Sequence, residues 1–271
     1  MPERMNTVLN CILRSKGKDQ QSSIHRKPVA ADLLTVCCLP RRKALRRLVG
    51  AVVAAVLGCD VLIVSGAESV REQEIRECRT GEIATWGDGL DRPAISSKLS
   101  FSYKPANAPA EFSPTLVAGM VAKAAAEWSK CGVSVDVLVW VDGARPAPDV
   151  VVVQWSGKGS AGNFGLADLG KRTLSLGRSA FELLRTRNPT HDTRETLQMV
   201  ISHEMGHFFG LMAHSRRCID VLSYYTDGKG SQCFTRDPAG IAGMAPGVDY
   251  RHVLPTACDI QRCRRANGLL P

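Results

Sequence analysis

Three of the chain's six histidines lie within twelve residues, in the pattern HExxHxxGxxxH at residues 203–214. On a helix, residues four apart lie about 40° apart around the axis and about 6 Å apart along it. His203 and His207 would therefore face the same way and could bind one ion. Glu204 would lie at the edge of that face, where a carboxylate can reach a water molecule bound to a metal. The segment therefore predicts a metal site with an acid–base carboxylate beside it.

The residues after this helix offer a third ligand. Gly210 allows a positive φ, which suits the end of a helix. The chain can then turn and bring His214 back towards the first two histidines. Three neutral imidazoles with one open position are typical of a catalytic zinc site, because a structural site has a fourth protein ligand. We therefore expect Zn²⁺ to be bound by His203, His207 and His214.

Residues 203–225 resemble the metzincin clan of zinc endopeptidases. The clan has the motif HExxHxxGxxH, often followed by Ser or Pro, and then a tight turn with a methionine beneath the metal; here Ser215 and the sequence VLSYY at 221–225 follow. The resemblance extends as a general layout over residues 95–267. It implies a metzincin-like α+β fold, with a twisted mixed sheet, an active-site helix and a C-terminal helix.

The chain departs from the clan at two positions. The usual spacing would place the third ligand at Ala213, which cannot bind a metal. His214 would replace it, with one extra residue in the loop after Gly210, and loops tolerate such insertions. Leu222 stands where the clan has its methionine, and a leucine of similar volume could fill that space at modest cost. Both departures bear more on activity than on fold.

The resemblance implies an exported zinc endopeptidase that acts on proteins or peptides. Zinc would lower the pKa of a bound water towards ~7, from about 15.7 in bulk, and Glu204 would accept its proton. The resulting hydroxide would attack the peptide carbonyl. In the astacin and serralysin branches, a tyrosine beside the turn binds zinc or the oxyanion, and Tyr224 is similar in position. Tyr225 is the other candidate, and a packing role for Tyr224 is the alternative.

Two other functions stay open at this point. One is a catalytically silent, exported binding domain that keeps the metzincin fold. The intact Glu204 speaks against this alternative, whereas Leu222 leaves room for it. The other is a zinc hydrolase that acts on a non-protein substrate.

The formal net charge of +9 is concentrated at one end of the chain. Residues 1–67 hold eleven Lys/Arg and four Asp/Glu, whereas the remaining residues hold 24 and 22. The basic excess therefore belongs to a targeting segment, and we expect no nucleic-acid partner. A basic cluster at 41–47 precedes an almost wholly apolar run at 48–67, which is the layout of an export signal.

Three interpretations of this segment place the later residues outside the cytoplasm. A cleaved signal peptide would end at the small residues Ser65-Gly66-Ala67. An uncleaved anchor would use residues 48–67 as a membrane tether, and a lipoprotein would be acylated at Cys59. We expect a secreted, periplasmic or surface-attached monomer, with a disordered extension at 1–40, the signal or anchor at 41–67 and the metallopeptidase domain at 68–271.

The cysteines agree with export. Six of the ten follow residue 67, and an even number in an oxidising compartment predicts three disulfides. Local spacing favours the pairs Cys218–Cys233, Cys258–Cys263 and Cys78–Cys131.

Alternation and capping signals predict the elements that carry these residues. We expect an irregular arm at 68–95, then strands at 98–103, 135–141, 149–155, 164–169 and 172–176, of which 135–141 and 149–155 should be buried. We expect helices at 113–130, 193–209 and 256–265, and a mobile loop at 157–165. Asp192 and Glu195 would form a capping box for the helix of His203. By the resemblance, Gly165-Leu166-Ala167 would be the strand that pairs with substrate; a simple hairpin is the alternative.

Overall fold

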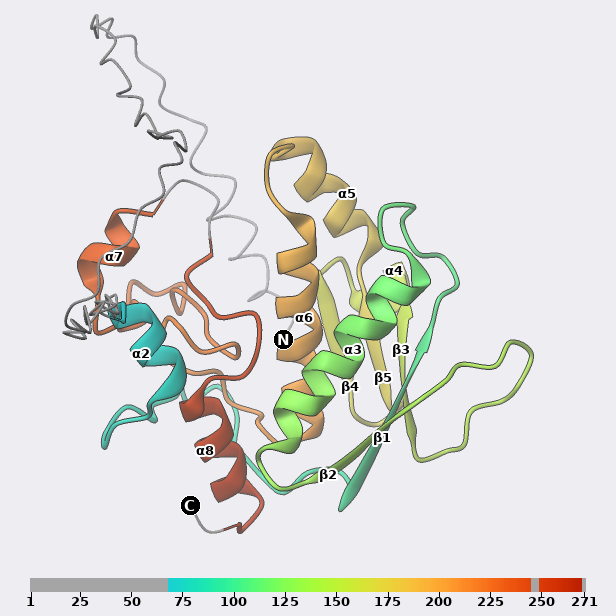
Figure 1. The fold of residues 1–271 in the computed structure, drawn as a ribbon, viewed down its shortest axis with the longest axis horizontal. Helices are drawn as coiled ribbons and strands as arrows, with labels where there is room; N and C mark the ends of the chain where they lie inside the picture. Colours follow the sequence, from blue (N-terminus) through green and yellow to red (C-terminus); the bar gives the residue numbers. More distant parts are fainter. Residues whose placement is uncertain (1–67, 245–248, 270–271) are drawn as a thin grey trace, which may run out of the picture. The chain divides into compact units, whose positions relative to one another are not determined.

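The structure is a computed structural model that describes residues 68–244 and 249–269. These residues form a mixed α/β fold, with one five-stranded sheet and several helices (Figure 1). The expected extension, export signal and lipidated Cys59 lie outside the described residues. Among the described residues, no helix is both long enough and apolar enough to span a bilayer.

The sheet has the strand order β2-β1-β3-β5-β4. The first four are mutually parallel and β4 runs antiparallel to β5. The strands are β1 (Lys98–Lys104), β2 (Ser134–Leu138), β3 (Val150–Trp155), β4 (Gly165–Asp168) and β5 (Thr173–Leu176). All five expected strands are present, and the antiparallel hairpin of β4 and β5 puts β4 at one edge of the sheet.

The expected burial of the strand at 135–141 is wrong. β2 ends at Leu138 and forms the other edge of the sheet, and residues of this run are largely exposed, with Val139 at 89% and Val141 at 62%. A β-branched apolar run favours a strand wherever it lies in a sheet. Such a run cannot distinguish an edge position from a central one.

Among the described residues, the two longest helices begin where we expected. In α3 (Pro114–Ser129) the Ser113 side chain accepts a hydrogen bond from the N–H of Leu116. In α6 (Thr193–Phe208) Asp192 is the N-cap, but its side chain accepts from the N–H of Arg194 and not from that of Glu195, as a capping box requires. A single side-chain cap therefore starts α6, and the expected capping box is absent.

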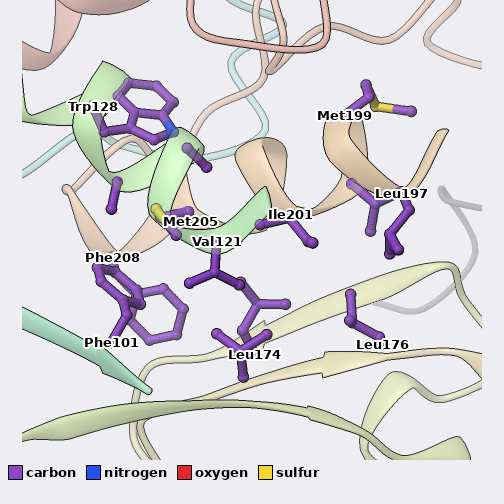
Figure 2. Packing of buried hydrophobic residues seen from close by; sticks show 14 of the residues in the cluster. Phe101, Val121, Trp128, Leu174, Leu176, Leu197, Met199, Ile201, Met205 and Phe208 are labelled. Carbon is purple, nitrogen blue, oxygen red and sulfur yellow. The ribbon is translucent and has the colours of Figure 1, made fainter. Parts of the chain in front are cut away.

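Helices α3 and α6 pack together against the sheet, with a continuous apolar core between them (Figure 2). Trp128 of α3 is fully buried, and its Nε1 donates to the carbonyl of Ser202, 2.8 Å away. The Trp128 ring also stacks on Phe209, with ring centroids 5.6 Å apart. This core fixes the C-terminal half of α6, which carries His203 and His207.

The described residues also contain four shorter helices that we did not expect. They are α2 (Val70–Arg76), α4 (Gly157–Ser160), α5 (Arg178–Arg187) and α7 (Pro238–Ala242). α4 occupies the glycine-rich segment that we expected to be a mobile loop. α5 follows β5 directly and buries Phe181 and Leu184.

The described residues contain three disulfides, as expected for this part of the chain, and three disulfides fit an extracellular location. The pair Cys218–Cys233 is confirmed. The pairs Cys258–Cys263 and Cys78–Cys131 are wrong, because the bonds are Cys78–Cys258 and Cys131–Cys263. The last two cysteines lie five residues apart on α8 (Ala257–Ala266), which places them about 140° apart around the helix axis. They therefore face different neighbours and cannot reach each other.

Candidate metal centre

The three predicted histidines come together at the C-terminal end of α6. Gly210 follows the helix with φ +97° and lets the chain reverse, which returns His214 towards His203 and His207. The Nε2 atoms of His203 and His214 are 3.2 Å apart, and one ring nitrogen of each of the three histidines lies within 4.8 Å of the others. Ala213 is buried beside them and offers no ligand. These three side chains form a group that could bind a metal ion.

The other ring nitrogen of each histidine is already hydrogen-bonded. Nδ1 of His203 lies 2.8 Å from the carbonyl oxygen of Val221, and Nδ1 of His207 lies 2.7 Å from that of Leu211. Nδ1 of His214 lies 2.8 Å from Oδ2 of Asp88. These partners only accept hydrogen bonds, so each neutral ring carries its proton on Nδ1. Each Nε2 lone pair is therefore free, and this donor set fits a zinc ion.

The surroundings favour uncharged imidazoles. Burial lowers the pKa of His203 well below its ordinary value and lowers that of His207 to about 4. Burial also lowers the pKa of His214, although its partner Asp88 opposes the change. Only neutral histidines bind metals, so these side chains are in the form that can bind a cation near neutral pH.

Glu204 is buried at the start of the motif, with one oxygen held and the other free of protein partners. Its Oε2 accepts a hydrogen bond of 2.8 Å from the N–H of Ala167 in β4, whereas Oε1 is buried and has no partner within the described part of the chain. Burial raises the pKa of this carboxyl to about 8. An unpartnered buried oxygen is costly in a native protein, and it indicates that a ligand or water completes the site.

Close packing of β4 against α6 holds this carboxylate. A Cβ atom placed on Gly165 would lie 2.7 Å from Cγ of Glu204 and 2.5 Å from Cγ1 of Val200. Real side-chain carbons do not approach so closely, so only glycine fits at this position. β4 is therefore an edge strand that lies beside Glu204 in a hairpin with β5, and its pairing with a substrate stays a prediction.

The turn at 221–223 lies beneath the histidines. Its Val221 carbonyl receives the hydrogen bond from His203, and Leu222 is fully buried against α6. A Cβ on Gly206 would lie 3.0 Å from Cδ1 of Leu222 and 2.7 Å from the Trp128 ring. Leu222 therefore fills the space under the helix, as a side chain of similar volume to methionine was expected to do.

The two candidate tyrosines have different surroundings. The Tyr224 ring stacks on His214, with ring centroids 3.9 Å apart and an interplanar angle of 21°. The Tyr225 hydroxyl donates to Asp249 and accepts from the N–H of Tyr250 at 2.5 Å. Burial raises the pKa of Tyr225. Tyr224 thus lies at the site, whereas the hydroxyl of Tyr225 is engaged elsewhere.

Two carboxylates near the site could not be identified from the sequence. Asp88 contacts His214, and Asp91 accepts from the N–H groups of Met212 and Ala213 at 2.9 and 3.1 Å. Both belong to the expected irregular arm, more than 120 residues before their partners. An acidic residue in such an arm is common, so no local signal distinguishes them.

A second cluster of ligand-type side chains contains Cys78, Glu82 and Cys258. Its two cysteines are joined as a disulfide, so they offer no thiolate to a metal. In the described parts of the chain, the histidine group is therefore the only such cluster suited to metal binding.

No family model and no curated protein matches this chain. A solved structure described as "GM1 bound form of the ECX AB5 holotoxin" has a chain that aligns with a TM-score of 0.41 and 12% sequence identity. The alignment covers 66% of this chain and 87% of that chain. A similarity at this level carries no argument about function.

Proposed function

We propose that the protein is an exported, zinc-dependent endopeptidase of the metzincin type. One observation carries the proposal: a ring nitrogen of each of the three histidines lies within 4.8 Å of the others, and Glu204, which follows His203 in the helix, has a buried carboxylate oxygen with no partner among the described residues. The antiparallel edge strand, the active-site helix and the C-terminal helix α8 support the same assignment. The resemblance leads us to expect an active-site helix and a C-terminal helix of this kind.

We propose a separate role for each group of residues in the site. His203, His207 and His214 would hold the zinc ion, which when bound would polarise a carbonyl and lower the pKa of water. Oε1 of Glu204 is the atom available to take a proton, since Oε2 is held by Ala167. Burial raises the pKa of this carboxyl to about 8, which makes its ionised form a stronger proton acceptor and lets the acid form return the proton to a leaving amine.

The neighbouring strand favours a peptide over a small non-protein substrate. Within the part of the chain that the structure describes, β4 is an edge strand that pairs with β5 alone, and it lies against Glu204. An extended peptide can pair with such an edge through main-chain hydrogen bonds. Tyr224, stacked on His214, is the side chain we propose to contact the oxyanion.

The test is a peptide-library digest by the purified, zinc-loaded protein. We expect cleavage that a chelator abolishes and added zinc restores. Glu204→Gln should retain zinc and lose about 10²–10⁴-fold in turnover, because it removes the general base. Glu195→Gln is the matched control, since Glu195 is an exposed residue on the same helix.

Two results would contradict the proposal. A wild-type protein that binds zinc but cleaves no peptide would favour a silent binding domain, or a hydrolase of non-protein substrates. Near-normal turnover by Glu204→Gln would show that this carboxylate is not the base.

A further inference from the structure

We propose that Asp88 is a positioning residue that sets the third ligand, and that the arm at 84–95 is part of the metal centre. The inference rests on the proposed zinc site but not on peptide hydrolysis. Helix α6 fixes the first two histidines, and each donates its Nδ1–H to a backbone carbonyl. His214 lies after the helix has ended, so something else must hold it.

The arm lies along the loop that carries His214. Four main-chain hydrogen bonds of 2.9–3.2 Å join the two segments. They run from Trp86 to His214, from Arg216 to Ala84, from Arg92 to Gly210 and from Ile95 to Phe208. The loop therefore has a partner along most of its length, although it belongs to no regular sheet.

The Asp88 carboxylate holds His214 at two points. Its Oδ1 accepts from the backbone N–H of His214 at 2.9 Å, and its Oδ2 accepts from Nδ1 of the same residue at 2.8 Å. The two side chains are only 10% and 12% exposed. One carboxylate thus fixes both the backbone and the ring, which directs Nε2 towards the other histidines. A carboxylate partner also makes an imidazole a stronger metal ligand.

Asp91 holds the residues just before the ligand. It accepts from the backbone N–H groups of Met212 and Ala213, and Arg262 of α8 binds both Asp91 and the Ala213 carbonyl. The fit is close at Gly89, where a Cβ would lie 2.5 Å from the Met212 carbonyl oxygen. The arm therefore supports the loop whose extra residue moves the third ligand from 213 to 214.

The test measures zinc affinity of the full chain by competition with a chromogenic chelator. Loss of an outer-shell partner typically weakens metal binding by about 10–100-fold, and we expect this for Asp88→Ala. Asp88→Asn keeps an acceptor for one of the two hydrogen bonds, so its loss should be smaller. Asp136→Asn is the control, because it removes a surface carboxylate that pairs with Lys98 at 2.5 Å.

A spectroscopic readout separates positioning from a general structural effect. The visible absorption of the cobalt-loaded protein reports the geometry of the ligands, so Asp88→Ala should change it while Asp136→Asn should not. If Asp88→Ala does not fold, Asp88→Asn, which keeps the volume, decides the question. Wild-type zinc affinity and an unchanged cobalt spectrum in a folded Asp88 variant would overturn the inference.

The same measurements distinguish this inference from the proposed function. A wild-type protein that binds zinc without cleaving peptides would refute the peptidase proposal, yet the affinity of the Asp88 variants would still test the positioning role. A wild-type protein that binds no zinc would overturn both.

Discussion

Gly165 is the position where a single methyl group should disable the proposed chemistry without touching a metal ligand. In Gly165→Ala the new Cβ would lie 2.5 Å from Cγ1 of Val200 and 2.7 Å from Cγ of Glu204. Carbon atoms in van der Waals contact are about 3.5–4.0 Å apart. Strand β4 and helix α6 must therefore separate by about 1 Å, because both neighbours are buried and cannot swing into solvent.

This displacement has two measurable effects. Overpacking of a well-packed site costs about 1–3 kcal/mol of the free energy of unfolding. The shift also lengthens the 2.8 Å hydrogen bond between Ala167 and Glu204 and moves the proposed base. A misplacement of about 1 Å at a reacting group can cost about 10²-fold in rate. Zinc content should stay at the wild-type level, since the atoms nearest to the added Cβ belong to Val200 and Glu204 and not to a histidine.

The assay combines urea unfolding, zinc content and kcat/KM on a cleaved peptide. Gly157→Ala is the matched control, because a Cβ on Gly157 meets no atom within 4 Å. It should leave zinc content and kcat/KM unchanged and should not lower the free energy of unfolding. If Gly165→Ala keeps kcat/KM within a few-fold of wild type, the reasoning that β4 fixes the position of Glu204 is refuted.

Two further predictions concern stability. Gly119 is exposed within α3, and a Cβ there meets nothing within 4 Å. Gly119→Ala should therefore raise the free energy of unfolding by about 0.5–1 kcal/mol, as measured with urea. A decrease would contradict the packing described for α3. Burial and the nearby Asp220 raise the pKa of Asp259 from the ordinary 3.8, so the native protein retains a proton that the unfolded chain releases, and wild-type stability falls as the pH rises above that value. Asp259→Asn removes this pH-dependent part of the free energy of unfolding. The free energy of unfolding of the variant, relative to that of the wild type, should therefore increase between about pH 5 and about pH 8. A difference that stays constant with pH would show that Asp259 is ionised in the native state.

The parts of the site that the sequence predicted are those set by local geometry. The spacing of His203 and His207 places them on one face of any helix, and Gly210 marks where that helix ends. His214 followed from chemistry, since Ala213 has no ligand atom. Ser113 likewise marked the start of α3. Each of these inferences needs only the residues within one or two turns.

The parts that could not be predicted depend on contacts between distant segments. Asp88 is 126 residues from His214, and its neighbours in the sequence are those of an ordinary loop. The pairing of Cys78 with Cys258 spans 180 residues, whereas the expected pairing used proximity along the chain. β2 has the composition of a central strand, and only the sheet order shows it to be an edge. Tertiary packing determines all three features.

The attachment of α8 has a consequence for when the protein can mature. α8 follows every other described helix and strand, yet two disulfides and the Arg262 contacts to the arm all end on it. A ribosome adds about 5–20 residues per second, so the arm and the His214 loop are made well before α8 exists. While it is being made, the nascent chain therefore lacks the contacts from α8 that hold the arm and the His214 loop in place. If the histidine group binds zinc as proposed, zinc loading should follow disulfide formation, because the site would be complete only after synthesis has passed α8 and the bonds to Cys258 and Cys263 have closed.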